Sequence, residues 1–221
     1  MTRLVTVAHG TRHPAGNGVA SGITAAAGER LGLPAVASYV ELCSPLFSSV
    51  LGSRTSSVVV PLLLSTGYHA RHDLPAAVAS AAGPVELGPP LGPDPLLAQA
   101  QVERLSQAGA RPGQPVVMVA AGSRDPLATG DLMLAAELLS STWGGPVRLS
   151  TLAGLGQRPG DVVRPGDAVS PYLLAPGLFA CRARSEPPTA AIVADVIGLH
   201  PAVVDLVVAR CTEMFARHRP A

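Results

Sequence analysis

The sequence predicts an α/β protein made of two similar lobes, each with a mainly parallel sheet. Short β-rich apolar runs alternate with longer Ala-rich segments that carry helix start and stop signals, which is the pattern of βαβ units. The same pattern occurs twice along the 221 residues. Hydrophobic residues make up 48% of the chain and aromatic residues only 3%, so the core has to be built from Val, Leu and Ala.

The first element is the apolar run at residues 3–8, which we expect to be a strand. The long segment 14–31 is expected to be a helix because it begins with Pro14 and is followed by Gly32, residues typical of a helix start and stop. Asp73 and Asp94 are expected to cap the starts of two further helices. The strands predicted after the first are 35–40, 57–64, 85–87 and 116–120. The further helices predicted in the first half are 45–51, 73–82 and 94–109.

Three pairs of segments indicate an internal duplication. The segment from His9 to Pro14 aligns with the one that contains Gly122, at an offset of 122 − 10 = 112. Residues 61–69 align with residues 171–179 at 177 − 67 = 110, and Leu91-Gly92 aligns with Ile197-Gly198 at 198 − 92 = 106. The matches keep their order, so we predict an N-terminal lobe at 1–112 and a degenerate C-terminal repeat at 113–221. We expect the second lobe to close a cleft over the first, and the Gly- and Pro-rich segment 157–166 to replace a helix there.

Composition and charge exclude several classes of protein. The formal net charge is +1 and every basic residue is Arg, so no basic surface for nucleic acid is indicated. The 3 cysteines are widely spaced and odd in number, which favours a reducing compartment over a disulfide framework. The sequence has neither a signal peptide nor an apolar run long enough to span a membrane. We therefore expect a cytoplasmic protein.

Polar side chains follow the first three predicted strands. His9, Glu41 and His69 each stand at or just after a strand end, and in an open α/β sheet the carboxyl ends of the strands lie beside the ligand site. Two imidazoles and a carboxylate suit a divalent first-row metal. The alternative is that the two histidines are satisfied polar residues at a loop edge, and that Glu41 is a cap or a solvated carboxylate.

The duplication supports the metal site because the ligands are missing from the second copy. His9 aligns with Ala121, His69 with Phe179, and Glu41 with Leu152 or Ala153. Loss of all three together indicates that they act as one unit, needed once per protein.

Anion-binding features surround these residues. Gly-containing turns before helix starts present backbone N–H groups to anions. Candidate substrate-binding residues in the first lobe are Gly10, Thr11, Arg12, Ser65, Thr66 and Gly67, and in the second lobe Ser123 and Arg124. For any single arginine, a solvated surface position is the simpler interpretation.

The other titratable residues are given structural interpretations. His13 and His72 are expected to be solvated loop residues, with metal delivery as the functional alternative. His200 and His218 are expected at the surface. Cys43 is expected to be a small buried filler, although it could serve as a soft metal ligand.

Several of these motifs together resemble a known family. The segment His9 to Arg12 with Asn17, the stretch from Glu41 to Pro45, and the pattern Gly67-x-His69-x-x-x-Asp73-x-Pro75 resemble the class II chelatases of the sirohydrochlorin chelatase type. One departure is Thr11, where the family usually has Ser. The resemblance implies two chelatase-like, flavodoxin-like three-layer lobes.

The resemblance also implies a function. Family members insert ferrous iron or cobalt into sirohydrochlorin or a related tetrapyrrole, for sirohaem or cobalamin biosynthesis, and need no cofactor besides the metal substrate. His9, His69 and Glu41 would be both the metal ligands and the catalytic residues. Iron, cobalt and nickel all suit such ligands, so the sequence does not choose among them.

Two other functions stay open at this point. One is a non-catalytic carrier of a tetrapyrrole or metal on the same fold. The other is a phosphoryl-transfer enzyme with His9 as nucleophile, which would give Glu41 no role. The partners expected are a tetrapyrrole and a divalent metal, without nucleic acid or membrane. We expect a monomer because two lobes in one chain can replace a dimer of single lobes.

Overall fold

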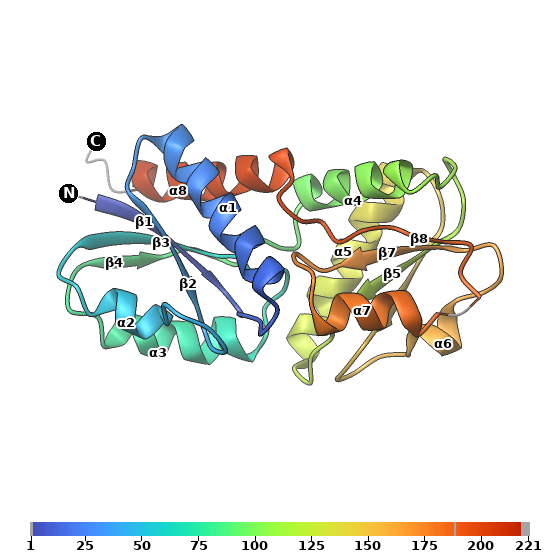
Figure 1. Ribbon diagram of the computed structural model, residues 1–221, viewed down its shortest axis with the longest axis horizontal. Coiled ribbons are helices and arrows are strands. Elements are labelled where there is room, and N and C mark those ends of the chain that lie inside the picture. The colour runs from blue at the N-terminus through green and yellow to red at the C-terminus, as the bar shows by residue number, and fades with distance from the viewer. Residues whose placement is uncertain (1, 188, 218–221) are drawn as a thin grey trace. The chain divides into compact units, whose positions relative to one another are not determined.

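The computed structural model describes residues 2–187 and 189–217. Chain contacts divide it into two compact units, one formed by Met1–Leu91 and Leu199–Ala221, the other by Gly92–Gly198. Each unit contains a four-stranded, all-parallel sheet with helices on both faces, so the predicted three-layer α/β architecture is confirmed (Figure 1).

The first unit has the strand order β2-β1-β3-β4. Helices α1 and α8 cover one face of this sheet, and α2 and α3 cover the other (Figure 1). Its strands are β1 (Thr2–Ala8), β2 (Ala35–Tyr39), β3 (Ser56–Pro61) and β4 (Val85–Leu87). Its helices are α1 (Pro14–Leu31), α2 (Phe47–Leu51), the π-helix η1 (His69–Asp73), α3 (Leu74–Ala79) and α8 (Pro201–Arg217).

The second unit repeats this order as β6-β5-β7-β8. Its strands are β5 (Val116–Ala120), β6 (Val147–Thr151), β7 (Ala168–Tyr172) and β8 (Ile192–Val193). Its helices are α4 (Pro95–Gln107), α5 (Pro126–Trp143), α6 (Pro159–Val162) and α7 (Leu178–Ser185). The segment 157–166 therefore holds a short helix, and the expectation that it replaces one is wrong.

Sheet register confirms the predicted duplication. Leu4 pairs with Val58 in the first sheet and Val116 pairs with Ala168 in the second, which gives offsets of 116 − 4 = 112 and 168 − 58 = 110. Val58 in turn pairs with Glu86, and Ala168 with Ile192, at an offset of 192 − 86 = 106. These are the three offsets predicted from the sequence.

The compact units do not follow the predicted boundary near residue 112. Helix α4, which follows β4 along the chain, packs on α5 and β7 of the second unit. Helix α8, which follows β8, packs on α1 and β3 of the first unit. Each repeat thus gives its last helix to the other unit, an arrangement we call the helix exchange.

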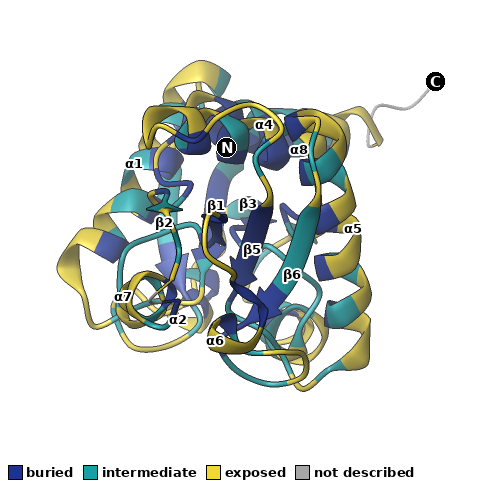
Figure 2. Ribbon diagram, turned by 90° about the vertical axis from the view of Figure 1, so that its right-hand side faces the viewer, coloured by how far each residue is buried: buried dark blue, intermediate teal, exposed yellow. Residues whose placement is uncertain are grey.

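The cores are aliphatic, as predicted from composition. In the first unit, Val5, Val7 and Val59 of the sheet pack against Phe47 and Leu51 of α2 and Leu74 of α3. In the second unit, Val117, Val119 and Val169 pack against residues of α6 and α7. Figure 2 shows the central strands as mostly buried, with exposed residues gathered on the outer faces of the helices.

Two predictions about helix ends need correction. Asp73 was expected to cap a helix, but its backbone is already helical and its side chain makes no capping bond, because the π-turn of η1 continues directly into α3. His200 was expected at the surface but is only 5% exposed. Its Nδ1 accepts a hydrogen bond from the Ala202 N–H at the start of α8. The predicted cap at Asp94 is confirmed, because its side chain accepts a hydrogen bond from the Leu96 N–H at the start of α4. His218 lies outside the described residues.

Candidate metal site

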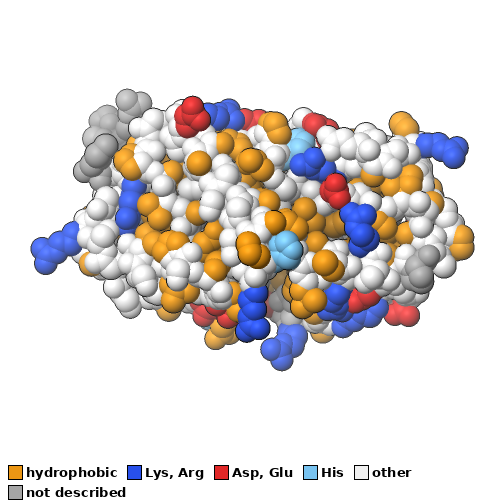
Figure 3. Space-filling view, viewed as in Figure 1, with side chains coloured by type: hydrophobic (Ala, Val, Ile, Leu, Met, Phe, Trp, Pro, Cys, Tyr) orange, Lys and Arg blue, Asp and Glu red, His pale blue; other side chains and the backbone are white. Residues whose placement is uncertain are grey.

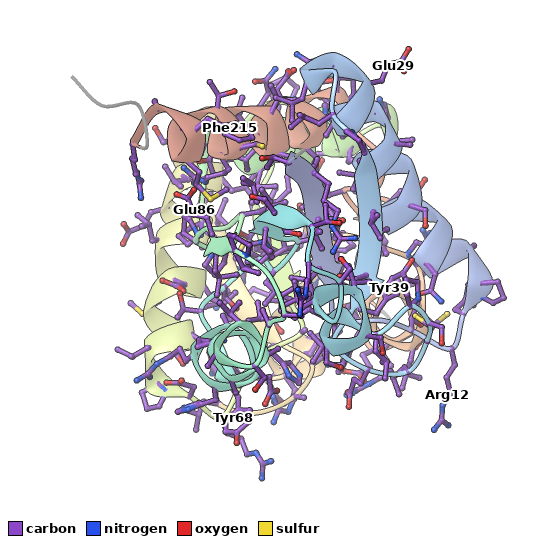
Figure 4. All side chains as sticks on the ribbon, turned by 90° about the vertical axis from the view of Figure 1, so that its left-hand side faces the viewer. Arg12, Glu29, Tyr39, Tyr68, Glu86 and Phe215 are labelled. Atoms are coloured by element: carbon purple, nitrogen blue, oxygen red, sulfur yellow. The ribbon has the colours of Figure 1, made fainter. Side chains whose placement is uncertain are left out.

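The candidate metal site lies where the first sheet changes its direction of winding. In the order β2-β1-β3-β4, the connections after β1 and after β3 run on opposite faces, and ligands of such sheets bind beyond the carboxyl ends of the strands at this point. His9 directly follows β1, Glu41 follows β2 and His69 begins η1 after β3. Figure 4 shows Tyr39, Arg12 and Tyr68 at this end of the unit and Glu29 and Phe215 at the other.

The structure brings the three predicted ligands together. Side-chain atoms of His9, Glu41 and His69 that could bind a metal all lie within 4.8 Å of one another. Donors that share one metal ion at ~2.0–2.2 Å lie up to ~4.4 Å apart, so small side-chain movements would allow all three to hold one ion. His9 and Glu41 are each 51% exposed at the side chain, which leaves the group open to exchange with solvent and substrate.

Hydrogen bonds leave the same nitrogen free on both imidazoles. His69 Nδ1 lies 2.5 Å from Asp73 Oδ2, and His9 Nδ1 lies 3.3 Å from the Gly10 carbonyl oxygen. His9 Nε2 faces Glu41 Oε1 at 3.6 Å. Metal-binding histidines usually donate their second ring N–H to a carboxylate or carbonyl. Both imidazoles therefore have surroundings like those of metal-binding histidines, with Nε2 directed toward the candidate site.

Gly10 allows the loop after β2 to approach this closely. Its φ is +96°, and a Cβ at this position would lie 2.0 Å from the carbonyl oxygen of Glu41. The Glu41 N–H donates to the His9 carbonyl, which ties the two ligand-bearing loops together. Leu42, next to Glu41, has a φ of +69° and is the one residue other than glycine with a positive φ in the described part of the chain. The Glu41 loop is therefore held in a conformation of higher energy beside the site.

Asn17 fixes the loop that carries His9. Its side-chain oxygen accepts from the Thr11 N–H at 3.2 Å, and its Nδ2 donates to the Thr11 carbonyl at 2.8 Å. The Thr11 hydroxyl accepts from the His13 N–H. The Thr11 hydroxyl is thus used within the loop. Ser123 has the same role in the second unit, where its hydroxyl accepts from the Asp125 N–H.

The second unit keeps the scaffold of this site without its ligands. A Cβ on Gly122 would lie 2.0 Å from the Ala153 carbonyl oxygen, as one on Gly10 would from Glu41. The Ala153 N–H donates to Ala121, as that of Glu41 does to His9. Ala153, rather than Leu152, is therefore the counterpart of Glu41. The offset of 110 between β3 and β7 likewise makes Phe179 the residue of the second repeat that corresponds to His69, since 179 − 69 = 110.

The other candidate residues lie near the same loops. Arg12 and Arg124 are exposed at equivalent positions, 124 − 12 = 112, and Figure 4 shows the Arg12 side chain extending away from the ribbon. Ser65, Thr66 and Gly67 form the half-buried turn between β3 and η1. His13 and His72 are exposed, and the His72 ring packs against Tyr68 with 4.7 Å between ring centroids.

Sequence reasoning missed the partner of His69. Asp73 stands four residues after His69, a spacing at which side chains meet on a helix, and this signal could have identified the contact. Cys43 is half-buried and does not belong to the group of potential ligands found among the described residues.

The wider surface carries no single dominant charge. Figure 3 shows hydrophobic, basic and acidic side chains interspersed on the face it presents, in keeping with the formal net charge of +1. None of the helices in the described part of the chain combines the length and hydrophobicity that a membrane span requires.

Comparisons with known proteins support the observed fold. Residues 3–108 match the family model CbiX. The chain resembles the structure of SirB from Bacillus subtilis with Fe3+, with 24% identity, a TM-score of 0.79, and coverage of 98% of this chain and 96% of that one. It also resembles CbiX, described as the terminal enzyme for biosynthesis of siroheme in denitrifying bacteria, with 17% identity, a TM-score of 0.72, and coverage of 99% and 100%.

A third structure is larger. DR2241 from Deinococcus radiodurans, a multi-domain protein with structural similarity to chelatases, matches at 21% identity and a TM-score of 0.72, with coverage of 96% of this chain and 55% of that one. No curated protein sequence matches the chain. The first repeat thus matches the CbiX family model, and the whole chain has the two-unit fold of the sirohydrochlorin chelatase structures it resembles.

Proposed function

We propose that the protein is a chelatase that inserts ferrous iron or cobalt into sirohydrochlorin or a related tetrapyrrole, for sirohaem or cobalamin biosynthesis. The observation that carries the proposal is the group formed by His9, Glu41 and His69, whose ligand atoms lie within 4.8 Å of one another in the repeat that matches the family model. The similar SirB structures are described with Fe3+ and with cobalt.

The three residues have complementary roles in this proposal. His9 and His69 bind the incoming metal through Nε2, and Glu41 balances part of its charge. Insertion replaces two pyrrole N–H protons by bonds to the metal, so a base must accept protons as these bonds form. His9, His69 and Glu41 are the groups that the site offers for this step. A bent macrocycle exposes its nitrogen lone pairs, so the site should bind a bent ring more tightly than a flat one.

Substrate binding uses the loops around the metal site. Sirohydrochlorin is a polycarboxylate, and the Gly10 and Gly67 turns lie beside the metal site where its carboxylates would bind. Arg12 and Arg124 each offer a guanidinium to a carboxylate at equivalent positions of the two repeats. Both repeats have this arginine, although only the first repeat has the candidate metal ligands. This supports a role for the arginines in binding an acidic substrate. No cofactor other than the metal substrate is needed.

The test is an oxygen-free metallation assay. Protein, sirohydrochlorin and ferrous or cobaltous ion are mixed, and the absorption spectrum of the ring is followed. Wild-type protein should accelerate metallation over the spontaneous reaction. His9→Ala and His69→Ala should each lower the enzymatic rate of metallation by at least ~10–100-fold, the loss caused by removing an outer-shell partner of a metal ligand. Phe179→Ala, at the position equivalent to His69, is the matched control and should keep its activity.

The same assay separates the alternatives. A carrier would bind the tetrapyrrole or metal and leave the rate at its spontaneous value. A phosphoryl-transfer enzyme would turn over a phosphate ester without added metal, and would be insensitive to Glu41→Gln. The placement of Glu41 Oε1 3.6 Å from His9 Nε2 favours the metal site over that alternative.

Two further parts of the proposal concern the state of the protein. We propose a cytoplasmic location, supported by the three cysteines, none of which is in a disulfide. We also propose a monomer, supported by the presence of both repeats in one chain. Sedimentation of the purified protein would test the second point.

A further inference from the structure

We propose that Asp73 is a positioning residue that fixes the tautomer and orientation of His69, and thereby makes His69 the anchoring ligand of the metal site. The inference deepens the proposed function and rests on its metal site. It does not depend on turnover of a tetrapyrrole.

The first argument is the contact itself. Asp73 Oδ2 lies 2.5 Å from His69 Nδ1. An ionised carboxylate only accepts hydrogen bonds, so this contact requires the proton of the neutral ring to be on Nδ1 and leaves the lone pair on Nε2. A carboxylate that accepts from a histidine in this way also makes the other ring nitrogen a better electron donor to a metal.

The second argument is the difference between the two imidazoles. The His9 Nδ1 partner is a backbone carbonyl at 3.3 Å, which is neutral and more distant. Hydrogen bonds to ionised acceptors are shorter and stronger than those between neutral groups. The His69 side chain is 29% exposed and that of His9 is 51% exposed. His69 is therefore the better oriented and better shielded of the two, and His9 with Glu41 forms the more exposed side of the group.

The third argument comes from the second repeat. At the offset of 110 set by the β7 register, Asp73 corresponds to 73 + 110 = 183, which is Ala183. Ala183 is fully buried in the core of that unit. The carboxylate is thus missing from the same copy that lacks His69. The helix that follows β7 forms without this carboxylate.

The local backbone explains how the contact arises. In η1 the N–H of Leu74 bonds to the carbonyl of His69, a π-type turn, and Pro75 follows without an N–H of its own. Asp73 makes no capping bond, so its carboxylate is available to His69. Single π-turns of this kind are frequent at functional sites.

The experiment measures metal binding without a tetrapyrrole. Co2+ is titrated into wild-type protein, Asp73→Asn, His69→Ala and the double variant, and binding is followed by d–d absorption and calorimetry. Asp73→Asn should weaken Co2+ binding by ~10–100-fold, the range for an outer-shell partner. The double variant should bind no more weakly than His69→Ala, because Asp73 acts through His69. Asp73→Glu should restore part of the affinity.

A spectroscopic readout distinguishes positioning from a structural role. Nitrogen-15 NMR of the metal-free protein should report a proton on Nδ1 of His69 in the wild type and a mixture of tautomers in Asp73→Asn. Asp125→Asn is the matched control, because Asp125 caps α5 of the second unit through the Leu127 N–H. The Asn side chain can keep this cap, so Asp125→Asn should change neither the fold nor the Co2+ affinity.

Three results would overturn the inference. The first is wild-type Co2+ affinity in Asp73→Asn, and the second is an unchanged His69 tautomer in that variant. The third is a further loss of affinity when Asp73→Asn is added to His69→Ala. None of these results depends on the metallation assay. The proposed function can therefore fail while this inference holds, and this inference can fail while the protein still metallates the tetrapyrrole.

Discussion

Replacing Gly10 by Ala tests whether the close approach of two backbone loops holds the metal ligands in place. The added Cβ would lie 2.0 Å from the Glu41 carbonyl oxygen, where ordinary contacts begin at 3.4 Å. The Glu41 loop would have to move by about 3.4 − 2.0 = 1.4 Å. Metal sites tolerate deviations in ligand distance of only about ±0.2 Å. Co2+ binding should therefore weaken by at least ~10-fold, the lower end of the effect of disturbing a ligand's support.

The second repeat supplies a control with the same perturbation and no ligands. Gly122→Ala places a Cβ 2.0 Å from the Ala153 carbonyl oxygen, at a φ of +85° against +96° for Gly10. An L-residue in this left-handed conformation costs about 1–2 kcal/mol, and the overlap adds to that figure. Both variants should therefore lose similar amounts of unfolding free energy in urea titrations, and only Gly10→Ala should lose Co2+ affinity.

The outcome can refute the reasoning in two ways. If Gly122→Ala weakens Co2+ binding as much as Gly10→Ala, the effect spreads through the whole fold and is not local to the Glu41 loop. If Gly10→Ala is destabilised but binds Co2+ like the wild type, the position of Glu41 does not matter for the metal.

The remaining predictions concern single side chains. Arg12→Ala and Arg124→Ala should each raise the KM for the tetrapyrrole by ~1.4–5-fold, as loss of an exposed ion pair worth ~0.2–1 kcal/mol would, and leave Co2+ affinity unchanged; a change in Co2+ affinity alone would contradict this. Cys43→Ser should leave Co2+ affinity and spectrum unchanged, and a lost sulfur-to-metal band would show that Cys43 is a ligand. Burial raises the pKa of Cys211 to about 11, so in the native protein a thiol reagent at pH 8 should label the exposed Cys181 first. Because the unfolded thiol ionises at lower pH than the folded one, this group should also reduce stability as pH rises from about 9 to about 11, and a flat melting temperature there would count against it.

Much of the fold could be predicted because local signals and tertiary structure agree. Helix α1 begins at Pro14 and ends at Leu31 as its Pro and Gly signals predicted. The offsets of the duplicated segments were also correct, because the repeats share strand lengths and register. The proximity of the three candidate ligands could be predicted from sequence because the ends of neighbouring parallel strands meet at one edge.

The errors occurred where a residue's partner is set by the fold. Asp is a residue type typical of helix caps, but the π-turn before Asp73 makes capping unnecessary, and its carboxylate contacts His69 instead. His200 looked like a surface residue because a buried histidine that caps a helix has no compositional signal. The space that Gly10 leaves for the Glu41 carbonyl depends on a neighbouring loop, and the sequence carries only the glycine itself.

The helix exchange makes folding of the two repeats interdependent. A fragment that ends near residue 112 would carry α4 without the α5 and β7 surface on which it packs, and would leave the apolar side of α1 and β3 uncovered because α8 is missing. Such a fragment can bury both surfaces at once by pairing with a second copy of itself, each copy lending α4 to the other. A gene for a single repeat whose α4 packs on a second copy would encode a homodimer, and tandem fusion of two such genes would give this chain.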